Sequence, residues 1–339
     1  MGEKVTVPDV TERAGVSGLA VRGVSTPGAS VSERTDKKVC SAAEAPGYRS
    51  NVLARSLVTG RGRIVGLLVA CAENQFYPGA IERLSRSPQK RGCHVPVLMA
   101  WNSGEEADGG MEDLLDYQVD GIIAASVGMS NDLTRRCAAA EIPIVLFNRA
   151  QDDDRLFAGT SGSCRGGCKM AEFLVAGGHS RIAHVAGRAG APTRRDREAG
   201  FVAGPGAAAQ SLFARYVSDF QFDRSGDVAR ERIADPDRPD AVFCASGHMA
   251  FVVMDVLRFG LGLSMPADGS VAGCDDVALS TWPSHDLTTM RQPAGQMAQA
   301  AIDIQMDRLA DPDAKPRRVA LDGPLILRGS ARIPRGWTA

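Results

Sequence analysis

Residues 7–24, with the sequence VPDVTERAGVSGLAVRGV, decide how the start of the chain folds. Apolar residues recur at helical spacing on both sides of 14–17, where Gly15 makes a tight turn and Ser17 is placed to cap the second helix. This pattern predicts a helix-turn-helix, whose second helix lies in the major groove of DNA with its first residues toward the bases. Those residues are Gly18, Leu19 and Arg22, and Ser17 faces a phosphate.

A third helix and a hinge are expected after this pair. Ser32 opens the helix with Glu33 in its first turn, and Val39 lies on the face that closes the small core. The run 47–57 places arginines on one side of a short helix and leucines on the other, which indicates a hinge. The chain should therefore begin with an all-α DNA-binding domain of residues 1–49, followed by a hinge helix and linker at 50–63.

A series of short motifs stands in one order along this segment: Asp9-Val10, 14–17, Val31-Ser32, 42–44, Gly47-Tyr48, Asn51 and 54–57. In this order and spacing they resemble the lactose-repressor/galactose-repressor family of bacterial transcription regulators. The resemblance implies that Leu57 wedges into the minor groove and kinks the duplex, and that Tyr48, Asn51 and Arg55 contact its backbone. The expected DNA-binding residues are Thr6, Ser17, Gly18, Leu19, Arg22, Thr26, Ser32, Tyr48, Asn51, Arg55 and Leu57.

Charge is distributed unevenly along the chain. The whole sequence has 339 residues and a net charge of −1. Residues 1–63 hold ten Lys/Arg and six Asp/Glu, whereas the remainder holds twenty-nine and thirty-four. A basic N-terminal segment followed by an acidic remainder is the distribution expected when the N-terminal segment binds the phosphates of DNA.

The sequence favours a cytoplasmic protein that is neither an enzyme nor a metalloprotein. It has no long apolar run and no N-terminal charged segment followed by an apolar one. The eight cysteines include no C-x-x-C pair, so they are expected to be buried thiols, although Cys164 and Cys168 are spaced to share a helix face. No phosphate-binding glycine motif follows a strand, and the five histidines, among them His179 and His184, are dispersed. We therefore expect no cofactor, no metal and no catalytic residue.

From residue 64 onward, short apolar runs alternate with amphipathic stretches. The runs are 64–69, 95–100, 121–125, 143–147, 182–186, 241–244, 270–273 and 287–290, and the helix candidates are 79–91, 107–118, 130–140, 166–177, 196–209, 224–234, 248–261 and 294–310. Alternation of this kind predicts doubly wound parallel sheets, and the length favours two sheets with a cleft between them. The family resemblance implies the same α/β core of two periplasmic-binding-protein-like lobes, here 64–160 plus 292–321 and 161–291 plus 322–339.

An effector site is expected where the strands end. Ligands bind at the carboxyl ends of parallel strands, and several marked residues converge there. A guanidinium suits hydroxyls or a carboxylate, an aspartate accepts sugar hydroxyls, and aromatic rings cover a sugar. By resemblance, Arg197 and Asp275 match the family's main effector-binding arginine and aspartate. The full expected set is Phe76, Arg197, Phe220, Ser246, Asp275 and Gln292.

The sequence departs from the family pattern in both regions. Ala245-Ser246-Gly247 replaces the usual Ala-Asn-Asp of the cleft, and Ala20-Val21-Arg22-Gly23 replaces Thr-Val-Ser-Arg in the recognition helix. The interpretation is a homodimeric repressor that binds a near-palindromic operator under the control of a sugar or sugar-acid effector. The alternative is a sugar-sensing protein whose DNA-binding head has decayed.

Overall fold

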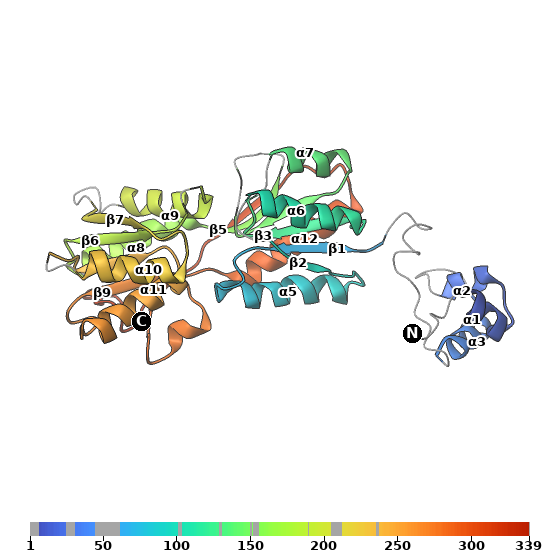
Figure 1. Cartoon of the computed structure of the whole chain (residues 1–339), viewed down its shortest axis with the longest axis horizontal. Coiled ribbons are helices and arrows are strands. Elements are labelled where there is room, and N and C mark those ends of the chain that lie inside the picture. Colours follow the sequence, from blue (N-terminus) through green and yellow to red (C-terminus); the bar gives the residue numbers. More distant parts are fainter. Residues whose placement is uncertain are drawn as a thin grey trace. The chain divides into compact units, whose positions relative to one another are not determined.

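The computed structural model describes residues 7–24, 31–44, 62–100, 104–128, 131–149, 151, 156–188, 190–204, 212–234 and 237–338. The chain divides into two compact units at the junction between Arg63 and Ile64 (Figure 1).

The first unit contains three short helices, α1 (Val7–Ala14), α2 (Gly18–Val24) and α3 (Glu33–Glu44). Each helix contributes one fully buried valine to their common core: Val10, Val21 and Val39. Gly15 adopts a left-handed φ of 61° at the turn, which glycine tolerates without strain. The predicted helix-turn-helix is thus confirmed.

Both predicted helix caps are present in this unit. The Ser17 hydroxyl accepts a hydrogen bond from the amide of Ala20 at 3.2 Å. The Ser32 hydroxyl does the same for the amide of Thr35 at 3.3 Å. Such caps satisfy backbone donors that a helix start leaves open.

The second unit contains two six-stranded sheets, and the predicted pair of parallel-sheet lobes is confirmed. The first sheet has the order β11-β5-β4-β3-β1-β2 and is parallel throughout. Its strands are β1 (Val65–Val69), β2 (Val97–Met99), β3 (Gly121–Ala125), β4 (Ile144–Phe147), β5 (Phe157–Ser161) and β11 (Arg318–Leu321). The helices α6 (Gly104–Asp116) and α7 (Asn131–Ala139) lie on one side of it and α5 (Phe76–Lys90) on the other, as Figure 1 shows. The helix α12 (Ala294–Ala310) packs against α5.

The second sheet has the order β12-β10-β9-β8-β6-β7, and only the β10–β12 pairing is antiparallel. Its strands are β6 (Ile182–Ala186), β7 (Ala214–Val217), β8 (Ala241–Cys244), β9 (Ser270–Asp275), β10 (Thr288–Arg291) and β12 (Leu325–Ile326). Its helical segments are α8 (Ser163–Ala176), α9 (Pro192–Ala203), α10 (Phe222–Val228), η2 (Ala229–Ile233), α11 (Gly247–Asp255), η3 (Val256–Gly260) and η4 (Ala278–Thr281). The chain passes from one lobe to the other after β5, after β10 and after β11.

Four strands were not among the predicted runs: β5, β7, β11 and β12. Strands β7 and β11 lie at sheet edges, and their residues alternate between exposed and half-buried, so they form no apolar run. All eight predicted runs overlap an observed strand, because those strands are mostly buried on both faces.

Glycine allows α8 and α9 to approach each other very closely. A Cβ built on Gly200 would lie 1.8 Å from the backbone oxygen of Cys164, and one on Gly167 would lie 2.2 Å from that of Arg197. The Cys168 thiol donates to the Gly200 carbonyl oxygen at 3.0 Å across the same seam. The backbone of α8 therefore fixes the position of the turn of α9 that carries Arg197.

We expect Gly200→Ala to destabilise the protein by about 1–3 kcal/mol, because the added methyl group meets backbone atoms that have no room to move. Chemical unfolding followed by circular dichroism measures this effect. Gly79→Ala is the matched control, since a Cβ at this exposed helical glycine meets nothing within 4 Å and should be neutral or slightly stabilising. Equal stabilities of the two variants would contradict the tight seam.

Candidate functional site

A cavity of about 440 Å³ lies between the two lobes, at the carboxyl ends of their strands. The first lobe contributes residues that follow β1, β3 and β4, and the second contributes residues that follow β6, β7 and β8. The six residues expected from the sequence to hold an effector all line this one cavity: Phe76, Arg197, Phe220, Ser246, Asp275 and Gln292.

A buried ion pair forms one wall of the cavity. Arg197 on α9 is 5% exposed and Asp275 at the end of β9 is 4% exposed. Arg197 Nη2 lies 3.5 Å from Asp275 Oδ1, while Nη1 donates to the backbone oxygen of Ala245. Burial opposes the charge of Arg197, but the nearby Cys274 and Asp275 leave its pKa above the ordinary value. The guanidinium is therefore charged and fixed in place.

Gln292 completes this group from the crossover after β10. Its Nε2 donates to Asp275 Oδ1 at 2.5 Å, so one carboxylate oxygen receives both the amide and the guanidinium. The Gln292 Oε1 atom is buried and has no hydrogen-bond partner among the described residues. A ligand hydroxyl could satisfy that acceptor.

Aromatic rings supply apolar surface on both sides of the cavity. Phe76 stacks on Phe147, with ring centroids 6.1 Å apart. The Phe220 ring lies directly over Gly187, where an added Cβ would be 2.0 Å from the ring. Apolar faces of this kind pack against the carbon skeleton of a sugar.

Sequence reasoning missed several polar groups of the cavity, of which Asn148 is the clearest. Its Nδ2 donates to the Tyr77 hydroxyl at 2.9 Å, and its Oδ1 is buried without a partner among the described residues. Burial raises the pKa of Tyr77 to about 12, so the phenol is neutral. Its position in the sequence could have indicated that Asn148 lies in the cavity. Asn148 directly follows a buried strand, and Asp275 stands at the end of another.

Many residues that line the cavity have left-handed backbone conformations, which cost free energy for residues other than glycine. The residues and their φ angles are Cys71 (60°), Ser126 (61°), Asn148 (64°), Asp219 (57°), Phe220 (63°) and Asp275 (91°). Strain of this kind persists where the surrounding structure enforces it, and it gathers at ligand sites.

The histidines near the sheets have different surroundings. His184 on β6 is buried against the rings of Phe201 and Phe243, and its Nδ1 lies 2.9 Å from the Phe243 carbonyl oxygen. Burial lowers the pKa of His184 to about 4, so this side chain is a neutral part of the core. His248 lines the cavity and contacts Gln75 of the other lobe at 3.2 Å.

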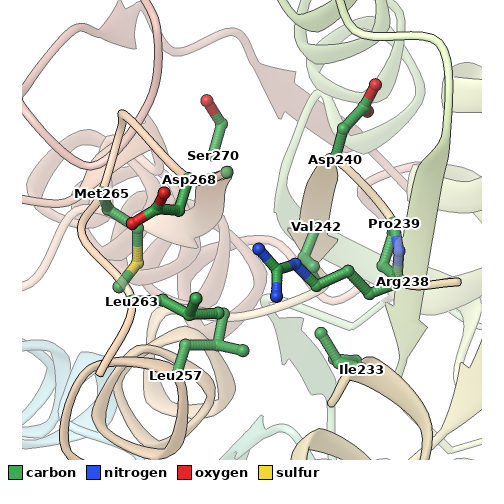
Figure 2. Close-up of a pocket in the computed structure, with 11 residues that line it drawn as sticks. Ile233, Arg238, Pro239, Asp240, Val242, Leu257, Leu263, Met265, Asp268 and Ser270 are labelled. Atoms are coloured by element: carbon green, nitrogen blue, oxygen red, sulfur yellow. The ribbon is translucent and has the colours of Figure 1, made fainter. Parts of the chain in front are cut away.

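A second, much smaller pocket lies at the other end of the second sheet. Figure 2 shows Arg238, Val242 and Leu257 among the residues around it. Its volume of about 20 Å³ holds roughly one water molecule, so it is too small for a sugar.

The predicted DNA-binding residues are only partly described. Leu19 on α2 is 81% exposed, with Gly18 beside it at the start of the helix. Ser17 and Ser32 occupy the cap positions described above. For Arg22 the structure describes the backbone in α2 only. Outside the described residues lie Thr6, Thr26, Tyr48, Asn51, Arg55 and Leu57.

Comparison with known proteins gives consistent results along the chain. The family described as "Periplasmic binding protein-like domain" matches residues 171–331. The ribose operon repressor of Escherichia coli (strain K12) is 29% identical over 331 residues, which cover 96% of this chain and 99% of the repressor. The chain is thus similar to a repressor along nearly its whole length, in line with its resemblance to the lactose-repressor/galactose-repressor family.

Solved structures of regulators share its architecture. The complex of the transcriptional regulator CelR with cellobiose has a TM-score of 0.72 at 26% identity, over 97% of this chain and 100% of that one. The lac repressor dimer bound to operator and the anti-inducer ONPF has a TM-score of 0.82 at 25% identity, over 97% and 99%. Among the described residues of this chain, no helix is long and apolar enough to cross a membrane.

We expect Asp275→Ala to destabilise the second unit, which begins at Ile64, by about 3–5 kcal/mol. The change leaves the buried guanidinium of Arg197 without its carboxylate partner. Asp275→Asn should cost less, since an amide oxygen can still accept a hydrogen bond there. Thermal melting of both variants measures the difference. Loss of the same size in each would mean that the charge of Asp275 does not stabilise the fold.

Proposed function

We propose that this chain is a DNA-binding transcriptional repressor whose operator affinity is controlled by a small sugar or sugar acid. The observation that carries the proposal is the cavity at the strand ends, lined from both lobes, in a chain that also has a helix-turn-helix. Among its relatives, one is a repressor of a ribose operon, and a structural neighbour was solved with cellobiose.

We assign a role to each part of the chain. Residues 1–49 bind DNA, residues 50–63 form the hinge and linker, and residues 64–339 bind the effector and dimerise. In a dimer each head reads one half of the operator, so the two-fold symmetry of the protein requires a near-palindromic site. With these roles, we propose that the protein is a regulator that acts in the cytoplasm and is not an enzyme.

Effector control follows from the position of the cavity. A ligand that contacts both lobes binds best at one relative angle of the lobes, and it shifts the population toward that angle. A change of angle alters the spacing of the two hinges in a dimer, and with it the affinity for operator.

The deciding experiment is selection of randomised duplex DNA by the purified full-length protein, followed by titration of the enriched duplex at several salt concentrations. We expect a near-palindromic consensus bound about a thousandfold or more tightly than random DNA at equal salt. Recovery of no consensus, with only weak salt-sensitive binding, would favour the alternative of a sensor with a decayed head.

Leu19→Ala then tests the recognition helix on the selected duplex. Because Leu19 is exposed, the change should leave the melting temperature unaltered, while specific affinity falls by about tenfold and affinity for random DNA stays constant. Lys38→Ala on α3 is the control for loss of an exposed side chain. An equal loss of affinity for the selected duplex and for random DNA would show that Leu19 on α2 does not recognise bases.

Arg197→Ala tests control by effector. We expect the variant to bind operator but to lose its response, in either direction, to any sugar that changes the operator affinity of the unaltered protein. Operator binding reports that the variant is folded, and Arg195→Ala, an exposed arginine on the same helix, is the control. A full response in Arg197→Ala would exclude the arginine from the effector site.

A further inference from the structure

Two arginines, one from each lobe, lie near each other at one edge of the cavity. Arg149 stands two residues beyond β4 in the first lobe, and Arg188 stands two residues beyond β6 in the second. Arg188 lines the cavity, as do Ser126 and Asn148, which adjoin Arg149 in space or in sequence.

Arg149 reaches from the first lobe to the second. Its Nη1 donates to the Ser126 carbonyl oxygen at 3.4 Å, and its Nη2 donates to the Gly190 carbonyl oxygen at 3.3 Å. Both bonds are near the long limit for N–H···O contacts, and a guanidinium has five N–H donors. The two hydrogen bonds of Arg149 are therefore weak, and they use only two of its five donors.

Arg149 forms no ion pair with a carboxylate in the part of the chain that the structure describes. The acidic groups that favour its charge are the Tyr77 phenol and the Cys71 thiol, and burial keeps the phenol neutral. Burial and the neighbouring charge of Arg188 lower the pKa of Arg149. A half-buried cation beside a second cation is stabilised by a bound anion.

Two carboxylates of the cavity have other partners. Asp275 forms an ion pair with Arg197 and accepts a hydrogen bond from Gln292, and Asp219 forms an ion pair with Arg224 on α10. Burial lowers the pKa of His248, and the Glu73 carboxylate nearby partly opposes that shift. Arg149 and Arg188 bring two positive charges close together at this edge of the cavity.

We propose that Arg149 and Arg188 form an anion-binding subsite, so that the effector is a sugar bearing a carboxylate or a phosphate rather than a neutral sugar. The inference rests on the proposed function, in which this cavity binds the effector. Two guanidinium groups from opposite lobes would bind one anionic group between them, and the ligand would thereby hold the lobes together.

Isothermal titration of the full-length protein with matched sugars tests the proposal. Each set contains a neutral sugar, its acid and its phosphate: glucose, glucuronate and glucose 6-phosphate; galactose, galacturonate and galactose 6-phosphate; ribose, ribonate and ribose 5-phosphate. Ionic strength is held constant. We expect one anionic sugar to bind about ten- to a hundredfold more tightly than its neutral counterpart, and the acid and phosphate members identify the anionic group.

Arg149→Gln and Arg188→Gln test whether these side chains cause the preference. Each should reduce it to about twofold or less, because the loss of affinity falls mainly on the anionic sugar. Arg86→Gln, an exposed arginine on α5, is the control for loss of one positive charge and should retain the full preference. Melting temperatures equal to that of the unaltered protein show that the variants are folded.

The remaining outcomes separate this proposal from the one on which it depends. A neutral sugar that binds more tightly than its anionic counterparts and alters operator affinity would overturn the anionic subsite and leave the repressor function in place. An anionic preference that survives in both glutamine variants would also overturn it. Operator binding without a response to any sugar of the nine would overturn effector control together with the subsite.

Discussion

A charged guanidinium buried at the end of a parallel sheet constrains much of the structure around it. Arg197 is compatible with the fold because Asp275 lies beside it and the Ala245 carbonyl accepts from its other side. Those partners come from the ends of neighbouring strands, β8 and β9, and Gln292 adds a third contact from a crossover. The glycine seam between α8 and α9 holds the arginine at the required depth. Close helix packing and the parallel strands thus together fix the positions of Arg197, Asp275 and Gln292.

The sequence was most informative where one physical signal dominates. Strands buried on both faces appear as apolar runs, which is why β3 and β8 could be located to within a residue. Edge strands such as β7 and β11 carry exposed and half-buried residues in alternation and give no such signal. The caps Ser17 and Ser32 could be placed because capping depends on local chemistry.

Cavity residues were predictable in proportion to how distinctive their chemistry is. Arg197 and Asp275 stand out by charge and by family motif, and the structure places them 3.5 Å apart. Asn148 and Arg149 follow β4 in a manner that looks like ordinary loop sequence, and their positions depend on how two lobes distant in sequence come together. No local pattern reports that the carbonyl oxygen of Gly190 lies within reach of Arg149.

The route of the chain between the lobes affects the order in which they are completed during synthesis. The first sheet lacks β11 and the helix α12 until residues 294–321 have been made, although its other strands are the first to leave the ribosome. Buried side chains of α12, among them Met297, Ala301 and Ile304, belong to its hydrophobic core. The second lobe, by contrast, has β6 to β10 in one continuous segment. The lobe that is translated first therefore waits for α12 and β11 until β6 to β10 of the other lobe have been made. During that time it exposes an apolar surface to chaperones and proteases.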